Sequence, residues 1–215
     1  EDTPMMKQYR EARASLTPDT LLLFRLGDFY EMFEVDAERG APVLGITLTK
    51  RHDMAMAGFP FHSAEGYLAK LLSNGYKVAI CEQLEAPKAG KLVKRGITRI
   101  LTPGTVLEER QLEVGQNNFI LALDCYKKAA SAAWLDLSTG KFILASVEDS
   151  NDLLAVFASL APHEYLIPEG LAEKAKRDPD VATFLDQFQN LLGEVTRTER
   201  PDYDFDQRSG AREVM

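Results

Sequence analysis

The order of apolar and polar positions along the first half of the chain alternates between helix-like and strand-like spacing. Thr3-Pro4 opens an amphipathic helix, and the apolar run at residues 21–26, ended by Gly27, predicts a buried strand. Asp28 and Glu31 have the spacing of a capping box, which predicts a helix over residues 28–40. The remaining pattern predicts a helix from Ser63 to Asn74 and strands at residues 43–49, 53–57, 76–82 and 94–101.

The pattern changes after residue 116. Three strands are predicted in quick succession, at residues 119–123, 130–137 and 141–145. They are followed by a helix, a strand, a helix and a strand, at residues 151–160, 165–167, 179–190 and 194–198, and residues 199–215 have no clear pattern. A three-stranded meander followed by helix–strand alternation is the order of a ribonuclease-H-like layer, although many folds share it.

A short charged helix is predicted at residues 108–113, between two loop-forming segments, and it marks a domain boundary. The fold class is therefore predicted to be α/β, with two domains. The first, residues 3–116, is expected to hold a mixed sheet, and the second, residues 117–215, a ribonuclease-H-like sheet that is cut short at its C-terminal end.

The charge of the chain is unevenly distributed. The net charge of −8 argues at first against nucleic acid, yet residues 39–107 hold ten basic and four acidic side chains. Residues 116–215 hold ten and seventeen, so the acidity belongs to the second half. A basic zone on an otherwise acidic chain can form an electrostatic footprint for nucleic acid. The alternative is a solvated loop and a strand edge protected by lysines, and both interpretations stay open here.

Cysteine and histidine positions exclude some classes of protein. Cys81 and Cys125 lie in different segments and form no disulfide framework, so we expect a reducing, cytoplasmic environment. The three histidines lack metal-ligand spacing with a cysteine, which predicts no zinc site. No apolar run reaches the roughly 18 residues of a membrane helix, and we expect no membrane partner.

The segment Gly27-Asp28-Phe29-Tyr30-Glu31-Met32-Phe33 admits two interpretations. In one it is only a helix start, with Phe29 and Phe33 facing the core. In the other, Phe29 stands exposed at the end of the sheet and can wedge between base pairs from the minor groove. A carboxylate such as Glu31 can have one of two roles beside DNA. It can accept a hydrogen bond from an N–H at the edge of a base, or it can disfavour tight binding to an intact duplex. A mispaired step would be the easiest to unstack.

Residues 27–33 resemble the Phe-x-Glu motif of the MutS family of DNA mismatch repair proteins. Further segments resemble the family in its own order, at residues 46–51, 56–62, 67–71, 78–83, 102–105 and 136–140. The resemblance is dense over residues 3–145 and thin afterwards. The loop at residues 52–54 is shorter than is common in the family, residues 86–90 are idiosyncratic, and the family's lever, clamp and ATPase regions are not in the sequence.

The resemblance implies a mismatch-recognition domain over residues 3–116 and a connector domain over residues 117–215 of a longer protein. Phe29 is then expected to stack on a mispaired base and Glu31 to hydrogen-bond it. Phosphate contacts are predicted for four basic residues near this segment or in the basic zone: Lys50, Arg51, Lys94 and Arg95.

Expected partners are double-stranded DNA with mismatches and a downstream repair protein that binds the connector. The complete protein is expected to be a homodimeric ATPase that uses ATP and Mg²⁺. Within this sequence no Walker A motif is present, so we expect no ATP hydrolysis, no cofactor and no catalytic residue here.

Two other classes of function stay open. Asp124 and Asp136 end the first two strands of the second domain, where a ribonuclease-H-like sheet can hold two Mg²⁺ ions for phosphodiester cleavage. The simpler interpretation is that both carboxylates end strands at polar turns. The third class is a MutS-like interaction module that does not take part in repair and whose acidic half docks a partner.

Overall fold

The computed structural model describes residues 3–51, 53–85, 92–105 and 117–206, with Arg51 described for its backbone alone. Contacts divide the chain into two compact units, Glu1–Pro103 and Gly104–Met215, called here the first and second unit. The boundary expected near residue 116 and the helix expected at residues 108–113 lie outside the described residues.

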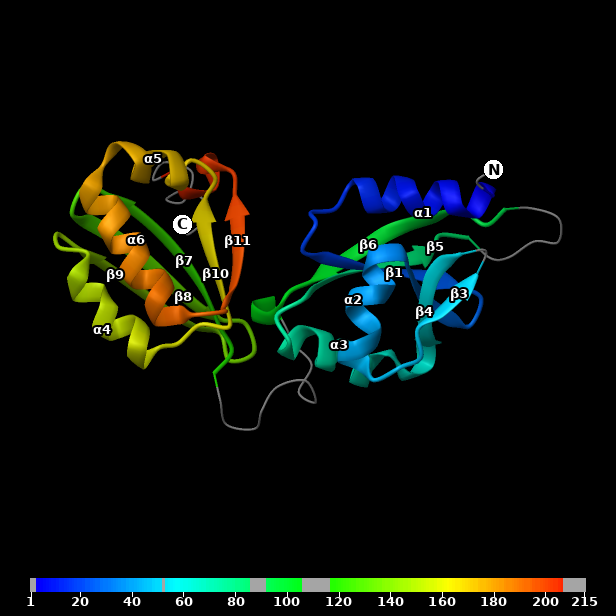
Figure 1. The fold of residues 1–215 in the computed structure, drawn as a ribbon. Helices are drawn as coiled ribbons and strands as arrows, with labels where there is room; N and C mark the ends of the chain where they lie inside the picture. The colour runs from blue at the N-terminus through cyan, green and yellow to red at the C-terminus, as the bar shows by residue number, and fades with distance from the viewer. Residues whose placement is uncertain (1–2, 52, 86–91, 106–116, 207–215) are drawn as a thin grey trace. The chain divides into compact units, whose positions relative to one another are not determined.

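The first unit is built on a six-stranded sheet of order β3-β4-β2-β1-β5-β6 (Figure 1). Only β1 and β5 run parallel, and every other neighbouring pair is antiparallel. The strands are β1 (Thr20–Leu26), β2 (Phe29–Phe33), β3 (Thr49–Arg51), β4 (Met54–Pro60), β5 (Lys77–Gln83) and β6 (Arg95–Leu101). The helices are α1 (Pro4–Ala14), α2 (Glu34–Leu44) and α3 (Ala64–Ser73), with a short 3-10 turn η1 (Phe61–Ser63). Another 3-10 turn, η2 (Pro103–Thr105), contains the division between the two units.

Helices cover both faces of this sheet (Figure 1). On one face α1 packs on alternate residues of the strands, so Tyr9 contacts Phe24 and Phe33 with edge-on ring geometry. On the other face α2 lies so close to the sheet that a side chain at Gly40 would meet Met32 and Leu21. Strands buried on both faces explain the continuous apolar run of β1.

Two sequence-based predictions for this unit are wrong. Residues 29–33 form β2 rather than the start of a helix, and α2 begins only at Glu34. The run Phe-Tyr-Glu-Met-Phe is rich in aromatic side chains that suit a pleated sheet, and β2 pairs on both edges, with β1 and β4. The strand expected at residues 43–49 is also absent, because α2 continues to Leu44 and ends at Gly45, whose φ is +68°.

The other predictions for the first unit are confirmed, with shifted ends. The strand expected at residues 53–57 is β4, which pairs with β3, and the helix expected from Ser63 is α3. The strands expected at residues 76–82 and 94–101 are β5 and β6, an antiparallel pair. None of the helices in the described part of the chain is long and apolar enough to cross a membrane.

The second unit has a five-stranded sheet of order β11-β10-β7-β8-β9. Strands β7 (Phe119–Tyr126), β8 (Ala129–Asp136) and β9 (Lys141–Val147) form the predicted antiparallel meander. Strand β10 (Glu164–Pro168) runs parallel to both β7 and β11 (Thr196–Arg200), as the ribonuclease-H-like order predicts. The helices are α4 (Asn151–Ser159), α5 (Leu171–Arg177) and α6 (Pro179–Leu192), of which α5 was not predicted.

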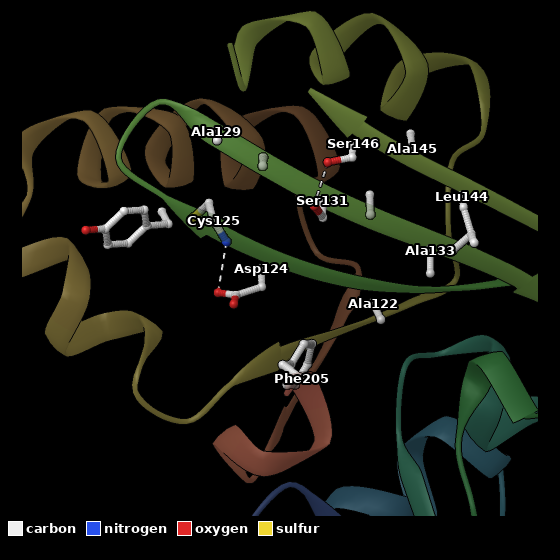
Figure 2. A pocket seen from close by; sticks show the side chains of 13 residues that line it. Ala122, Asp124, Cys125, Ala129, Ser131, Ala133, Leu144, Ala145, Ser146 and Phe205 are labelled. Atoms are coloured by element: carbon white, nitrogen blue, oxygen red, sulfur yellow. Dashed lines mark hydrogen bonds between the residues drawn. The ribbon is translucent and has the colours of Figure 1, made fainter. Parts of the chain in front are cut away.

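The helices of the second unit pack on one face of its sheet. Trp134, Phe157 and Phe188 form the centre of that core, and the Trp134 indole donates to the Leu160 carbonyl at 3.1 Å. Part of the opposite face carries mainly alanine and serine side chains of β7, β8 and β9. A hollow there is bordered by Leu144 and by Phe205 of the last 3-10 turn, η4 (Asp202–Phe205) (Figure 2).

Candidate nucleic-acid interface

The β1–β2 turn presents Phe29 at one end of the first sheet. Leu26 pairs directly with Phe29, which leaves Gly27 and Asp28 as a two-residue hairpin loop. Gly27 has φ +59°, and glycine is the residue that tight hairpin turns favour at the first loop position. The sequence therefore places an aromatic side chain directly beside a two-residue turn.

On one face of β2 the exposed fraction of the side chains rises toward the β1–β2 turn. Phe33, Glu31 and Phe29 share one face of the strand, since successive side chains alternate between the two faces. Phe33 lies under α1 and is 1% exposed, Glu31 is half-buried, and Phe29 is 42% exposed. The expectation that Phe29 and Phe33 both face the core is therefore wrong, because α1 covers only one end of this face.

Glu31 lies in the middle of the sheet rather than on a helix. It pairs with Phe24 of β1 on one side and with Gly58 of β4 on the other. Phe29 pairs with Pro60, so the methionine-alanine-glycine and proline positions of residues 56–60 form the strand directly beside the Phe-x-Glu segment. The structure thus brings Phe29 and Glu31 together on one face, two residues apart.

Phe61 is a neighbour of this site that the sequence did not single out. It is 38% exposed, and its backbone N–H donates to the Asp28 carbonyl at 2.9 Å across the end of the sheet. The guanidinium carbon of Arg25 lies 3.4 Å from the centre of the Phe61 ring. The available signal was an aromatic residue directly after the Pro60 that ends β4, but such spacing does not reveal which strand lies alongside.

Lys50 and Arg51 lie at the opposite end of the sheet from Phe29. Lys50 pairs with Ala55, which is five residues along β4 from Pro60, the partner of Phe29. That offset corresponds to about 17 Å of strand. Lys50 is exposed on β3, and β4 separates it from β2. Lys50 and Arg51 are therefore not immediate neighbours of Phe29.

Lys94 and Arg95 follow the β5–β6 connection, at the same end of the sheet as the Gly27–Asp28 turn. Lys94 is exposed, and its backbone N–H donates to the Glu85 carboxylate at 2.9 Å. Arg95 is occupied within the unit, because its Nε donates to the Arg25 carbonyl at 2.7 Å. Its guanidinium also lies 5.3 Å from the centre of the Phe24 ring, and burial lowers the pKa of the group.

The two aspartates of the nuclease alternative do not meet. Asp136 pairs with Phe119, whereas Asp124 lies five residues further along β7, about 17 Å away. Asp124 forms an ion pair with the Lys174 ammonium at 3.0 Å. It also accepts the Cys125 N–H (Figure 2). Asp136 accepts the backbone N–H and the hydroxyl of Ser138, as expected for a carboxylate that ends a strand at a turn. Within the described residues no group of acidic, histidine or cysteine side chains has the arrangement of a metal site.

Comparison with known proteins decides the family. The family model described as MutS domain I matches residues 3–110, and the one described as MutS domain II matches residues 118–213. The chain belongs to the MutS family. The resemblance found at residues 27–33 and in the following segments is thereby confirmed for both halves of the chain.

Curated relatives of the chain agree with this assignment. The DNA mismatch repair protein MutS of Myxococcus xanthus is 46% identical over 189 residues, which are 85% of this chain and 20% of that protein. The proteins of the same name from Staphylococcus saprophyticus and Staphylococcus aureus are 43% and 42% identical over 187 residues, again 84% of this chain and 21% of theirs. The chain therefore spans about a fifth of the length of the curated relatives it matches.

Proposed function

We propose that the first unit recognises mispaired or unpaired bases in duplex DNA and so initiates DNA mismatch repair in a longer MutS-family protein. The observation that carries the proposal is the exposed Phe29 ring at the β1–β2 turn, with Glu31 beside it on the same face. The names of the relatives, DNA mismatch repair protein MutS, support the same role.

In the proposed mechanism Phe29 inserts between base pairs from the minor groove and kinks the duplex. An inserted aromatic must break stacking, which costs a few kcal/mol per step. A mispaired step has already lost part of its pairing energy, so insertion there costs less, and the difference produces selectivity. Phe29 suits this role because β2 is paired on both edges, which makes the base of the wedge rigid.

Glu31 is proposed to accept a hydrogen bond from the edge of the displaced base. A hydrogen bond to an ionised acceptor is stronger than one between neutral groups. Against an intact duplex the same carboxylate finds no free base edge and faces the phosphates, which is unfavourable. Glu31 is half-buried and lies between Phe24 of β1 and Gly58 of β4, which positions its carboxylate on the same face as Phe29.

Phosphate contacts are proposed for Lys94, at the same end of the sheet as the wedge, and for Lys50 and Arg51 at the far end. An offset of about 17 Å spans roughly five phosphates of one DNA strand. A duplex that crosses the sheet can therefore reach both ends. Arg95 was predicted to contact DNA as well, but its guanidinium is used inside the unit, and we assign it to packing.

The second unit is proposed to be the connector between this reading unit and an ATPase elsewhere in the complete protein. That protein is proposed to work as a homodimer that uses ATP and Mg²⁺, and the connector to offer a surface to a downstream repair protein. These proposals rest on the family membership of residues 118–213. The separation of Asp124 from Asp136 disfavours the nuclease alternative for the same unit.

The experiment is DNA binding by the complete protein at one fixed salt concentration. A duplex with a G·T mismatch is compared with its matched control, for the wild type, Phe29→Ala and Phe142→Ala. Phe142 is an exposed phenylalanine of the second unit and serves as the control. We expect Phe29→Ala alone to lose the preference for the mismatch and the kink, measured by energy transfer between dyes at the duplex ends. Full discrimination by Phe29→Ala would refute the wedge.

A further inference from the structure

Four side chains on the reverse side of the β1–β2 hairpin form a connected cluster behind Phe29. They come from four different elements and are Arg25 of β1, Tyr30 of β2, Phe61 of η1 and Glu82 of β5. Arg25 pairs with Tyr30 across the hairpin, so both lie on the face opposite Phe29 and Glu31. We call this set the Arg25 cluster.

Arg25 is the centre of the cluster and contacts three groups: a backbone carbonyl, an aromatic ring and a carboxylate. Its Nε donates to the Gly27 carbonyl at 2.6 Å, in the turn itself. Its guanidinium carbon lies 3.4 Å from the centre of the Phe61 ring, a cation–π contact. Its Nη1 lies 3.8 Å from one carboxylate oxygen of Glu82, and the arginine side chain is only 15% exposed.

The cluster also fixes the turn from its other sides. The Tyr30 hydroxyl donates to the second carboxylate oxygen of Glu82, and the Phe61 N–H donates to the Asp28 carbonyl at 2.9 Å. Burial, together with the Glu82 charge, raises the pKa of Tyr30 to about 12, so this hydroxyl keeps its proton at neutral pH. Both residues of the loop, Gly27 and Asp28, thus have a carbonyl held by the cluster.

A rigid turn is more important for a side chain that inserts into DNA than for an ordinary surface loop. A ring on a mobile turn loses conformational freedom when it inserts, and this cost weakens the selective step. A planar guanidinium with five fixed donors can hold a carbonyl, a carboxylate and a ring together, which a single ammonium cannot. We propose that Arg25 is a positioning residue, held by Glu82 and Phe61, that fixes the Gly27–Asp28 turn and thereby sets the mismatch selectivity of Phe29. The inference rests on the proposed function.

The chain offers a close control for Arg25. Arg39 of α2 also donates to a loop carbonyl, that of Pro18 at 2.6 Å, and also lies over an aromatic ring, that of Tyr76 at 5.2 Å. Within the described residues, these contacts of Arg39 lie outside the β1–β2 turn. Loss of Arg39 therefore reports the general effect of removing an arginine that braces a loop of the same unit.

The first measurement needs no DNA and uses the 215-residue chain. Trp134 is the only tryptophan, so Trp134→Phe with Phe29→Trp places a single fluorescent reporter at the wedge. Time-resolved anisotropy then reports how freely that ring moves. We expect Arg25→Met and Glu82→Gln to increase its mobility, Arg25→Lys to restore part of the order, and Arg39→Met to leave it unchanged, with circular dichroism confirming that each variant is folded.

The second measurement uses the complete protein with Phe29 intact. We expect Arg25→Met to lower the ratio of G·T to matched-duplex affinity by about tenfold while matched-duplex affinity stays within about twofold. Arg25→Lys should recover part of that ratio, and Arg39→Met should keep it. Equal losses on both duplexes, an unchanged ring mobility, or the same effect from Arg39→Met would overturn the inference. A wild type without any mismatch preference would instead refute the proposed function, and the anisotropy would still decide whether Arg25 holds the turn.

Discussion

The missing side chain of Gly58 provides the space in which the Glu31 carboxylate lies. A β-carbon at Gly58 would stand 2.6 Å from the carboxyl carbon of Glu31 and 2.8 Å from the Tyr30 carbonyl oxygen, closer than real β-carbons come to other atoms. The backbone of Gly58 does not require a glycine conformation, since its φ is not in the left-handed region. The glycine is therefore needed for room, and the room is used by Glu31.

We predict that Gly58→Ala displaces Glu31 and lowers the preference for the mismatch, as we also expect of Glu31→Ala. A hydrogen bond to a charged group contributes about 1.5–3 kcal/mol, so the loss should be about tenfold or more in the affinity ratio. The measurement is the ratio of G·T to matched-duplex affinity of the complete protein at fixed salt. Gly66→Ala is the control, because a β-carbon there meets no atom within 4 Å. Normal discrimination by Gly58→Ala would show that Glu31 does not need this position.

The salt dependence of DNA affinity tests the proposed phosphate contacts at the two ends of the first sheet separately. If Lys50 and Lys94 each contact one phosphate, replacing either with alanine should reduce the slope of log affinity against log salt by about 0.9. Matched and mismatched duplexes should be affected equally, because phosphates carry no sequence information. Titration of binding over a range of salt concentrations gives the slope, with the exposed Lys128 of the second unit as control. An unchanged slope for Lys50→Ala would remove the far end of the sheet from the DNA contact.

The error at residues 28–33 shows what the sequence alone could not decide. Asp28 and Glu31 have capping-box spacing, but the same residues also suit a hairpin loop followed by a strand. The choice depends on partners distant in sequence, since β2 pairs with β4 as well as with β1. The arrangement of Arg25 with Glu82 and Phe61 was hidden for the same reason, because three separate elements bring them together.

Other parts of the fold were readable because their signals are local. The meander β7–β8–β9 was predicted from three closely spaced strand-like segments, and the structure has Gly140, whose φ is +70°, in the turn between the last two. Helix α5 was missed, because only Leu171 of its seven residues is buried and no apolar stripe is visible. The choice of Phe29 and Glu31 as site residues came from the family resemblance, and their roles remain predictions.

Glu164 is a buried carboxylate that holds the beginning of the second unit. One oxygen accepts the Gly104 N–H at 3.2 Å, the other accepts the Thr198 hydroxyl at 2.7 Å, and Glu164 is almost fully buried. We predict that Glu164→Ala lowers the free energy of unfolding of this unit by about 1–3 kcal/mol, because a buried N–H loses its acceptor. Trp134 fluorescence during urea unfolding reports this unit alone. The exposed Glu169 provides the control, and equal effects of Glu169→Ala and Glu164→Ala would contradict a specific role.

Asp36 joins three elements of the first unit through one buried carboxylate. Its Oδ2 accepts the Leu22 N–H at 3.2 Å and the Tyr9 hydroxyl at 3.4 Å, and it lies 3.2 Å from Nε of Arg13. Burial raises the pKa of Asp36, and the attraction of Arg13 offsets only part of that effect. The folded protein therefore holds the Asp36 proton more tightly than the unfolded chain does.

The raised pKa of Asp36 predicts how the stability of the first unit depends on pH. The contribution of a carboxyl with a raised pKa is complete below its unfolded pKa of about 3.9 and is lost as pH rises through the folded pKa. Relative to Asp36→Asn, the wild type should therefore lose stability between about pH 4 and its folded pKa, with a slope of at most about 1.4 kcal/mol per pH unit, and the difference should then level off. Hydrogen exchange of the β1 amides measures this in the first unit, with Glu34→Gln, an exposed carboxylate of the same helix, as control. A difference that grows in favour of the wild type as pH rises would mean that the Arg13 ion pair outweighs burial.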